Sequence, residues 1–274
     1  MMDLWTQGLT LEQASRAFMF LLGVSLALQT LEYLVIDRLD RVLTFDVQIR
    51  EMPQWPSWWR PMLKRCFAGP VYRAGLGLRL ALSGLLMLGW HGLPISLSLM
   101  ALALLLLFRW RGAFNGGSDF MTLMGLTALL LADGLGPWLG PQQAWRAALW
   151  FLTIQLLTSY FMSGWVKIKH AGWRNGTALP VFLDTGIYGP LPVRSLLRHP
   201  DLARLLSWIF ILWEGLFVVV FLDVRLAWLG CVAGMVFHTL VFRYFGLNRF
   251  LWAWLATYPA LIYAVTEIGL SLKY

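Results

Sequence analysis

The sequence predicts an all-α polytopic transmembrane helix bundle, and three observations support this fold class. Of the 274 residues, 59% are hydrophobic and 13% are charged, whereas soluble domains average about 45–50% apolar and about 25% charged residues. The mean hydropathy is +0.65. Apolar runs of membrane-spanning length recur along the chain, and one water-soluble core cannot bury them all. An ordinary soluble enzyme, a disulfide-rich secreted scaffold and a disordered chain are therefore excluded.

Eight apolar runs are candidate spans, because about 20 apolar residues cross the ~30 Å hydrocarbon core of a bilayer. They cover residues 17–36, 74–92, 93–108, 120–139, 144–166, 205–222, 226–245 and 250–266. Glycine and proline, as in Gly136–Pro137 and Gly140–Pro141, mark joints between runs. The third run is short and follows the second through a tight turn, so it is either a span or a re-entrant segment. Seven spans are the alternative.

The first run begins the bundle as a retained membrane helix. It follows acidic and polar residues rather than a basic stretch, and no cleavage site of the A-x-A type comes after it. Cytoplasmic loops of membrane proteins are enriched in lysine and arginine. With eight spans, 17 of the basic residues lie on one side and four on the other. This asymmetry predicts that both termini lie outside the cytoplasm, and the chain suits a bacterial inner membrane.

Two loops carry most of the basic residues. The loop 37–73 contains Trp55, Trp58 and Trp59 close to lysine and arginine side chains, a pattern typical of an interfacial helix at headgroup depth. A partner-docking surface is the alternative. The second basic loop covers 167–204. Because the +8 net charge lies mainly in loops between apolar runs, it predicts contact with lipid headgroups rather than with nucleic acid. No repeat divides the chain, so we expect a single domain over 1–274.

Ionisable side chains inside the apolar runs are candidate functional groups, since each costs at least ~2.5–3.5 kcal/mol in a bilayer. Glu32 and Asp133 lie near run ends, where we expect them to reach the interface. Arg79 lies within the second run. Glu214 and His238 lie in the middle of consecutive runs, where they can approach each other, although a lone histidine is also a common hydrogen-bonded core residue.

Cysteine and glycine spacing adds little chemistry. Cys66 and Cys231 are far apart, with no cysteine or histidine at metal-ligand spacing, so neither a metal site nor a disulfide framework is indicated. Gly230 and Gly234 form a G-x-x-x-G pair, which permits close helix packing.

The segment from Tyr160 to Leu179 is the most informative part of the chain. If its helix continues, Lys167, His170 and Trp173 share one face, because they are spaced at i, i+3 and i+6. A lysine against an apolar wall is able to act as a base. A lysine that snorkels to the interface from a helix end is the alternative interpretation.

The pattern Ser-Gly-x-x-Lys-x5-Trp-x-x-Gly-x-Ala-Leu over residues 163–179 resembles the signature of the HTTM domain, which is shared with vitamin K-dependent gamma-carboxylases. The segment Phe114–Phe120, with Asn115-Gly-Gly and Asp119, is similar to a second landmark of that family. The segment from Phe237 to Leu251, with His238 and Gly246, is similar to a third. These landmarks occur in family order and cover about 105–265.

The resemblance implies a role for each candidate residue. Lys167 corresponds to the lysine that deprotonates vitamin K hydroquinone in the carboxylases, so it is the candidate base. Glu214 or His238 would stabilise charge near it. The ligand-binding candidates are Trp173, Glu214, His238, Asp119 and His170. The implied cofactor is a quinone such as reduced vitamin K, and the implied ligand class is quinone-like or lipid-like.

Two features favour a different role. A carboxylase has a large extramembrane region after its helix bundle, whereas the last run here is followed by eight residues. The charge asymmetry also places Lys167 on the cytoplasmic side, opposite to the side on which a carboxylase acts. The alternative is a non-catalytic membrane component of a peptide-toxin maturation or export system, similar to the sporulation-delaying protein B group, with a partner membrane or redox protein. Transport is a third alternative, but the chain has no internal repeat of the kind found in common transporters.

Overall fold

The computed structural model describes residues 4–39, 59–110 and 116–271, and within these ranges every regular element is a helix. The predicted all-α class is therefore confirmed. The long helices are α2 (Leu11–Leu39), α5 (Gly69–Met87), α6 (Leu93–Arg109), α7 (Ser118–Leu139), α8 (Pro141–Lys169), α11 (Pro200–Gly215), α12 (Val224–Phe245) and α14 (Tyr258–Ser271). The short elements are α1 (Leu4–Gln7), α4 (Trp59–Cys66), α9 (Ala171–Arg174), α10 (Ala178–Leu183), η2 (Leu196–Arg198), η3 (Phe217–Leu222) and α13 (Asn248–Leu255).

Four helices, α2, α7, α8 and α12, are long and apolar enough to cross a membrane, as an integral membrane protein requires. The other predicted spans are helical but shorter or broken. The run 205–222 changes from α11 to the 3-10 helix η3 after Gly215. The run 250–266 breaks between α13 and α14, where Pro259 has no N–H to continue the ladder of α13. The count of eight spans stays a prediction.

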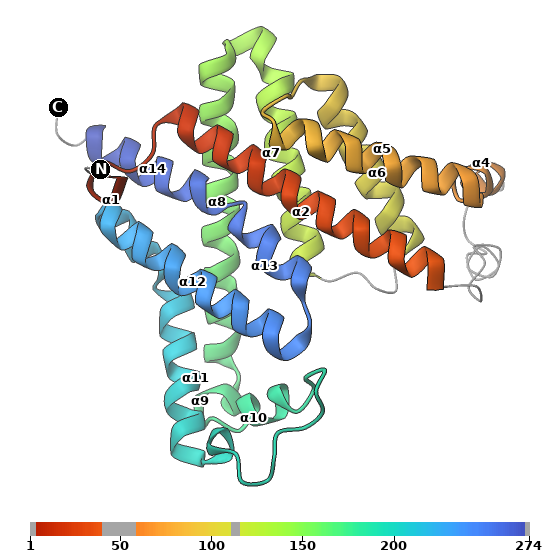
Figure 1. Ribbon diagram of the computed structural model, residues 1–274. Helices are drawn as coiled ribbons and strands as arrows, with labels where there is room; N and C mark the ends of the chain where they lie inside the picture. The colour runs from red at the N-terminus through yellow and green to blue at the C-terminus, as the bar shows by residue number, and fades with distance from the viewer. Residues whose placement is uncertain (1–3, 40–58, 111–115, 272–274) are drawn as a thin grey trace.

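The helices cross one another rather than lying in one parallel bundle (Figure 1). Helices α7 and α8 form a long hairpin that turns at Gly140, whose φ of +80° is strained for a residue with a side chain. Helices α2 and α14 run across this hairpin, and α11 runs beside the last part of α8. The segment after α1 packs against α14 and α12, since a Cβ on Gly8 would meet Thr266 and Val224.

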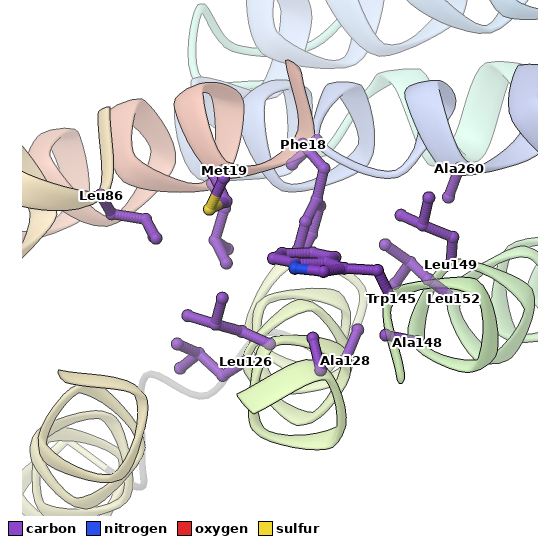
Figure 2. Packing of buried hydrophobic residues seen from close by; sticks show 14 of the residues in the cluster. Phe18, Met19, Leu86, Leu126, Ala128, Trp145, Ala148, Leu149, Leu152 and Ala260 are labelled. Atoms are coloured by element: carbon purple, nitrogen blue, oxygen red, sulfur yellow. The ribbon is translucent and has the colours of Figure 1, made fainter. Parts of the chain in front are cut away.

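The main apolar core lies where α2 crosses the α7–α8 hairpin (Figure 2). Phe18 and Trp145 meet edge to face with their ring centroids 6.3 Å apart, and Leu126 and Leu149 complete the layer from α7 and α8. Many large apolar side chains elsewhere are exposed, including Phe161 at 51%. Such exposure is costly in water and ordinary for helices that face lipid.

Two carboxylates that we expected to reach the interface also contact neighbouring elements, and their depth in the bilayer stays a prediction. Asp133 of α7 is hydrogen-bonded to His91 Nδ1 at 2.6 Å and accepts from the Gly92 N–H at 3.1 Å, which fixes the turn between α5 and α6. Glu32 of α2 pairs with Arg249 of α13 at 2.5 Å. Interior charges are costly unless they are paired, and these contacts give each carboxylate a partner.

Within the predicted basic loop 37–73, residues 40–58 lie outside the described residues, and Trp55 and Trp58 are among them. Within it, α4 is amphipathic: Leu63 is buried, whereas Arg60, Lys64 and Arg65 are exposed. An interfacial position for this helix stays a prediction.

Helices α8 and α11 touch through backbone at one point. A Cβ added to Gly164 of α8 would lie 2.5 Å from the Gly215 nitrogen and 2.8 Å from its Cα, whereas a Cβ on Gly215 meets nothing within 4 Å. The contact therefore requires glycine on the α8 side only.

We expect Gly164→Ala to destabilise the protein by about 1–3 kcal/mol, because backbone cannot move aside as a side chain does. Gly215→Ala is the matched control, since it gives the same gain in helix propensity without the clash. Thermal unfolding of both purified variants measures the difference. Equal unfolding temperatures would show that the close α8–α11 contact does not form.

Candidate functional site

Lys167 and Glu214 form an ion pair between the last turns of α8 and α11. Lys167 Nζ donates to Glu214 Oε2 at 2.5 Å and to Ser163 Oγ at 2.6 Å. The lysine side chain is 16% exposed and the glutamate side chain 3%. The pair is therefore largely removed from solvent, and the carboxylate compensates the ammonium charge across the helix contact that Gly164 permits.

Trp173 contacts the same ammonium group, but it is not placed there by the continuous helix that we expected. Helix α8 ends at Lys169, and His170 is extended at φ −87° and ψ 121°, so the predicted continuous helical face is not formed. The chain turns at His170 into α9, which brings the Trp173 ring to 5.4 Å from Lys167 Nζ. His170 itself is exposed and is not part of this cluster.

The later residues of the lysine motif, Gly176 and Leu179, lie where the chain turns back toward α11. Gly176 has φ +85°, and a Cβ there would lie 2.4 Å from the backbone nitrogen of Arg204, so glycine is required on both counts. Leu179, in α10, is buried. The Trp208 indole N–H donates to the Arg174 carbonyl at 3.0 Å and ties this turn to α11.

The rest of the basic loop 167–204 is also held by specific contacts. Arg198 pairs with Asp184 at 2.7 Å, and the Leu191 N–H donates to the same carboxylate at 2.9 Å. The Leu191 N–H and the Arg198 guanidinium lower the pKa of Asp184 below its ordinary value, so it stays ionised at neutral pH. The loop therefore has a folded structure beside the ion pair.

His238 of α12 is buried in an aromatic cluster beside α8, about two helical turns before Lys167. Its Nε2 is hydrogen-bonded to the Tyr160 hydroxyl at 3.0 Å, and Tyr160 is hydrogen-bonded to the Tyr258 hydroxyl at 3.0 Å. The imidazole ring lies 4.8 Å from the Trp254 ring and 5.0 Å from the Phe250 ring, centroid to centroid. Its Nδ1 is buried without a hydrogen-bond partner among the described residues.

The expected contact between Glu214 and His238 is not made. Each has its own partner, and no hydrogen bond or ion pair links them within the described ranges. Their surroundings are nevertheless adjacent, because Tyr160 beside His238 packs its ring 5.1 Å from Trp213, the neighbour of Glu214. The two sites are therefore separate hydrogen-bonded groups joined by aromatic packing.

The three motif segments meet in space although they are far apart in sequence. Gly117, from the second segment, packs against Phe250, which in turn contacts His238 of the third. His238 is bonded to Tyr160, one helical turn before Ser163 of the lysine motif. Phe114 and Asn115 lie outside the described residues. Asp119 is buried at the start of α7 but faces Arg79 and Tyr33 across a separate space, rather than Lys167.

Several site residues were not singled out from the sequence. Ser163 belongs to the motif, and with Tyr160 and Lys167 it has i, i+3, i+7 spacing, a signal for one shared helix face. Tyr258 and Trp254 gave no such signal, because aromatic residues are ordinary in apolar runs. Gly234 admits the tyrosine pair, since a Cβ there would lie 2.3 Å from the Tyr258 hydroxyl; the packing role predicted for this glycine is confirmed.

Comparisons of the chain with protein-family models, curated proteins and solved structures find no match. Within the described ranges, no group of three or more His, Cys, Asp or Glu side chains is placed to hold a metal ion. The groups available for chemistry at this site are therefore an ammonium, a carboxylate, a hydroxyl and aromatic rings.

We expect Lys167→Met to destabilise the protein by about 3–5 kcal/mol, because it leaves the Glu214 carboxyl buried without its partner. The double variant Lys167→Met/Glu214→Leu removes both charges and should recover most of that loss. Thermal unfolding of both single variants, Lys167→Met and Glu214→Leu, and of the double variant gives the coupling. Simple additivity of the two losses would mean that the charges do not form a pair.

Proposed function

We propose that this protein is an HTTM-like integral membrane protein that binds a small quinone-like or lipid-like molecule at the Lys167–Glu214 pair. The observation that carries the proposal is the ion pair itself, at 2.5 Å between two helices of an apolar bundle. A buried ion pair contributes little net stability compared with apolar packing. Ionisable groups retained inside membrane helices therefore indicate function more often than stability.

The pair supplies a simple proton-exchange chemistry. In the ion pair the proton is on Lys167 Nζ, and its transfer to Glu214 Oε2 leaves a neutral amine beside a carboxylic acid. The amine is then able to take a proton from an acidic hydroxyl of a bound molecule, such as a quinol. The resulting ammonium and the quinol anion attract each other, and Glu214 retains the first proton. Ser163, which accepts from Nζ at 2.6 Å, holds the nitrogen in place.

The aromatic side chains provide the apolar part of the site. The Trp173 ring lies 5.4 Å from Nζ and is a candidate surface for stacking a flat ligand. The Tyr160–His238 hydrogen bond lies on the far side of Trp213 and would supply a second polar group to a larger molecule. In this proposal His238 stabilises charge and is not the base.

The way in which the chain crosses the membrane is also a proposal. We infer eight crossings in a bacterial inner membrane, with both termini outside the cytoplasm. The charge asymmetry of the loops supports this orientation. The helices α11 and η3, and likewise α13 and α14, would each form one interrupted crossing.

A non-catalytic role in a membrane complex, such as peptide-toxin maturation or export, is the second candidate. One observation favours it: Glu214, Ser163 and Trp173 already engage the ammonium group. In this case the ion pair only holds α8 against α11, and a partner membrane or redox protein would complete the function.

We expect a quinone or another apolar small molecule to co-purify with the wild-type protein and to be lost from Lys167→Met. Lys169→Met is the matched control, because Lys169 is exposed on the same helix turn and stacks on Trp165 rather than on Glu214. Mass spectrometry of lipid extracts from the three purified proteins measures the difference.

Equal ligand content in all three folded proteins, or only bulk phospholipid in each, would contradict the ligand-binding proposal. The second candidate would then be tested by cross-linking in the native membrane, with the same variants as controls.

A further inference from the structure

Arg79 is a cation in the interior of the protein, in the middle of α5, and is 2% exposed. Its Nη1 donates to the Leu26 carbonyl oxygen at 3.0 Å and to Thr30 Oγ1 at 2.6 Å. Its Nη2 donates to Gln29 Oε1 at 2.9 Å. All three acceptors belong to α2 and are neutral, so they fix the guanidinium without compensating its charge.

The guanidinium has unused hydrogen-bonding capacity. It carries five N–H groups, and three hydrogen bonds are formed. Nε is among the buried atoms without a partner in the described ranges. Asp119 lines a space that Arg79 also borders, but no carboxylate of the described residues forms an ion pair with Arg79. A buried cation that forms no ion pair of its own is costly, and a carboxylate in direct contact with it would relieve that cost.

A cavity of about 120 Å³ lies between α5 and α6 with Arg79 in its wall. The rest of its lining is largely apolar and includes Phe67, Leu76 and Leu102. Val71, also in the lining, is 54% exposed, so the cavity reaches the outer surface of α5. An apolar cavity of about 150 Å³ holds a benzene ring, so this one has room for a short stretch of an alkyl chain.

We propose that this cavity binds a long-chain carboxylic acid, with its carboxylate at Arg79 and the first part of its chain between α5 and α6. Arginine is well suited to carboxylates because it offers paired N–H donors in a fixed geometry. The remainder of the chain would extend past Val71 into lipid. The site shares no residue with the Lys167–Glu214 pair, so the two proposals stand or fall separately.

The chemistry favours a carboxylic acid over a phospholipid. A carboxylic acid is able to cross the apolar wall in its protonated, neutral form and to release the proton once it lies beside a cation. The proton leaves to the aqueous phase, and the carboxylate forms a charge-assisted hydrogen bond with the guanidinium. A phosphodiester stays charged on the way in, and its bulky headgroup exceeds the space available.

The test alters the cavity and leaves Arg79 in place, because Arg79 also holds α2. Gly75 lines the cavity, and a Cβ there meets only Leu102 Cδ2, at 3.6 Å. Gly75→Leu therefore fills the space. Gly77→Leu is the matched control, since Gly77 is exposed on the same helix and its Cβ would meet nothing within 4 Å.

We expect radiolabelled palmitate to bind the wild-type protein and Gly77→Leu equally in phosphatidylcholine nanodiscs, and Gly75→Leu at least about tenfold more weakly, about 1.4 kcal/mol. Hexadecanol, which lacks the charge, should compete poorly. Equal binding to Gly75→Leu, or equal competition by hexadecanol, overturns the proposal. Competition by phosphatidylglycerol as strong as that by palmitic acid would identify a phospholipid as the anion. It would overturn the proposal that the ligand is a carboxylic acid.

A second measurement needs no variant and covers the case in which Gly75→Leu does not fold. Cys66 lines the cavity, whereas Cys231 is buried elsewhere in the protein. Palmitate should slow the reaction of Cys66 with N-ethylmaleimide in the wild-type protein, as followed by intact mass, and hexadecanol should not. An unchanged rate with saturating palmitate would place its binding outside this cavity.

Discussion

The ion pair between Lys167 and Glu214 is the constraint on which the organisation of this end of the protein depends. Neither charge is tolerated alone in an apolar interior, so α8 and α11 must meet at the height where the two side chains reach each other. Gly164 permits that contact because it places backbone directly against backbone. The turn after α8 then folds back over the pair, and Gly176 supplies the left-handed conformation that this return requires.

The other interior charges obey the same rule, with one exception. Asp133 holds the turn between α5 and α6, and Glu32 joins α2 to α13 through Arg249. In each case a carboxylate about two turns before the end of its helix fixes a neighbouring element. Arg79 differs, because it lies in mid-helix and its partners are neutral oxygens of one helix. Its charge is therefore the least compensated of those described in the interior of the molecule.

The sequence predicted the helices well, because apolar runs and their glycine and proline joints are local signals. It also singled out Glu214, since a charge in an apolar run needs a partner, and it singled out Lys167 and Trp173 through their spacing and the resemblance of their motif. It did not predict that Glu214 pairs with Lys167 rather than approaching His238, or that Asp119 lies beside Arg79. Both depend on which helices become neighbours, and crossing angles are set by packing over the whole chain. Tyr258 escaped notice because a tyrosine in an apolar run is unremarkable until its hydroxyl finds a partner.

Lys167 Nζ has more contacts than are needed to hold α8 against α11. A joint needs one opposite charge, which Glu214 provides. Here a hydroxyl and an aromatic face are added at the same nitrogen, from Ser163 and Trp173. All three interactions are strong when the nitrogen is charged and weaken when it is neutral. In the proposed function, a change in the protonation of this one atom would act on the position of α11 and on the turn that carries Trp173, and it would link the proposed proton exchange to the arrangement of the elements around the site.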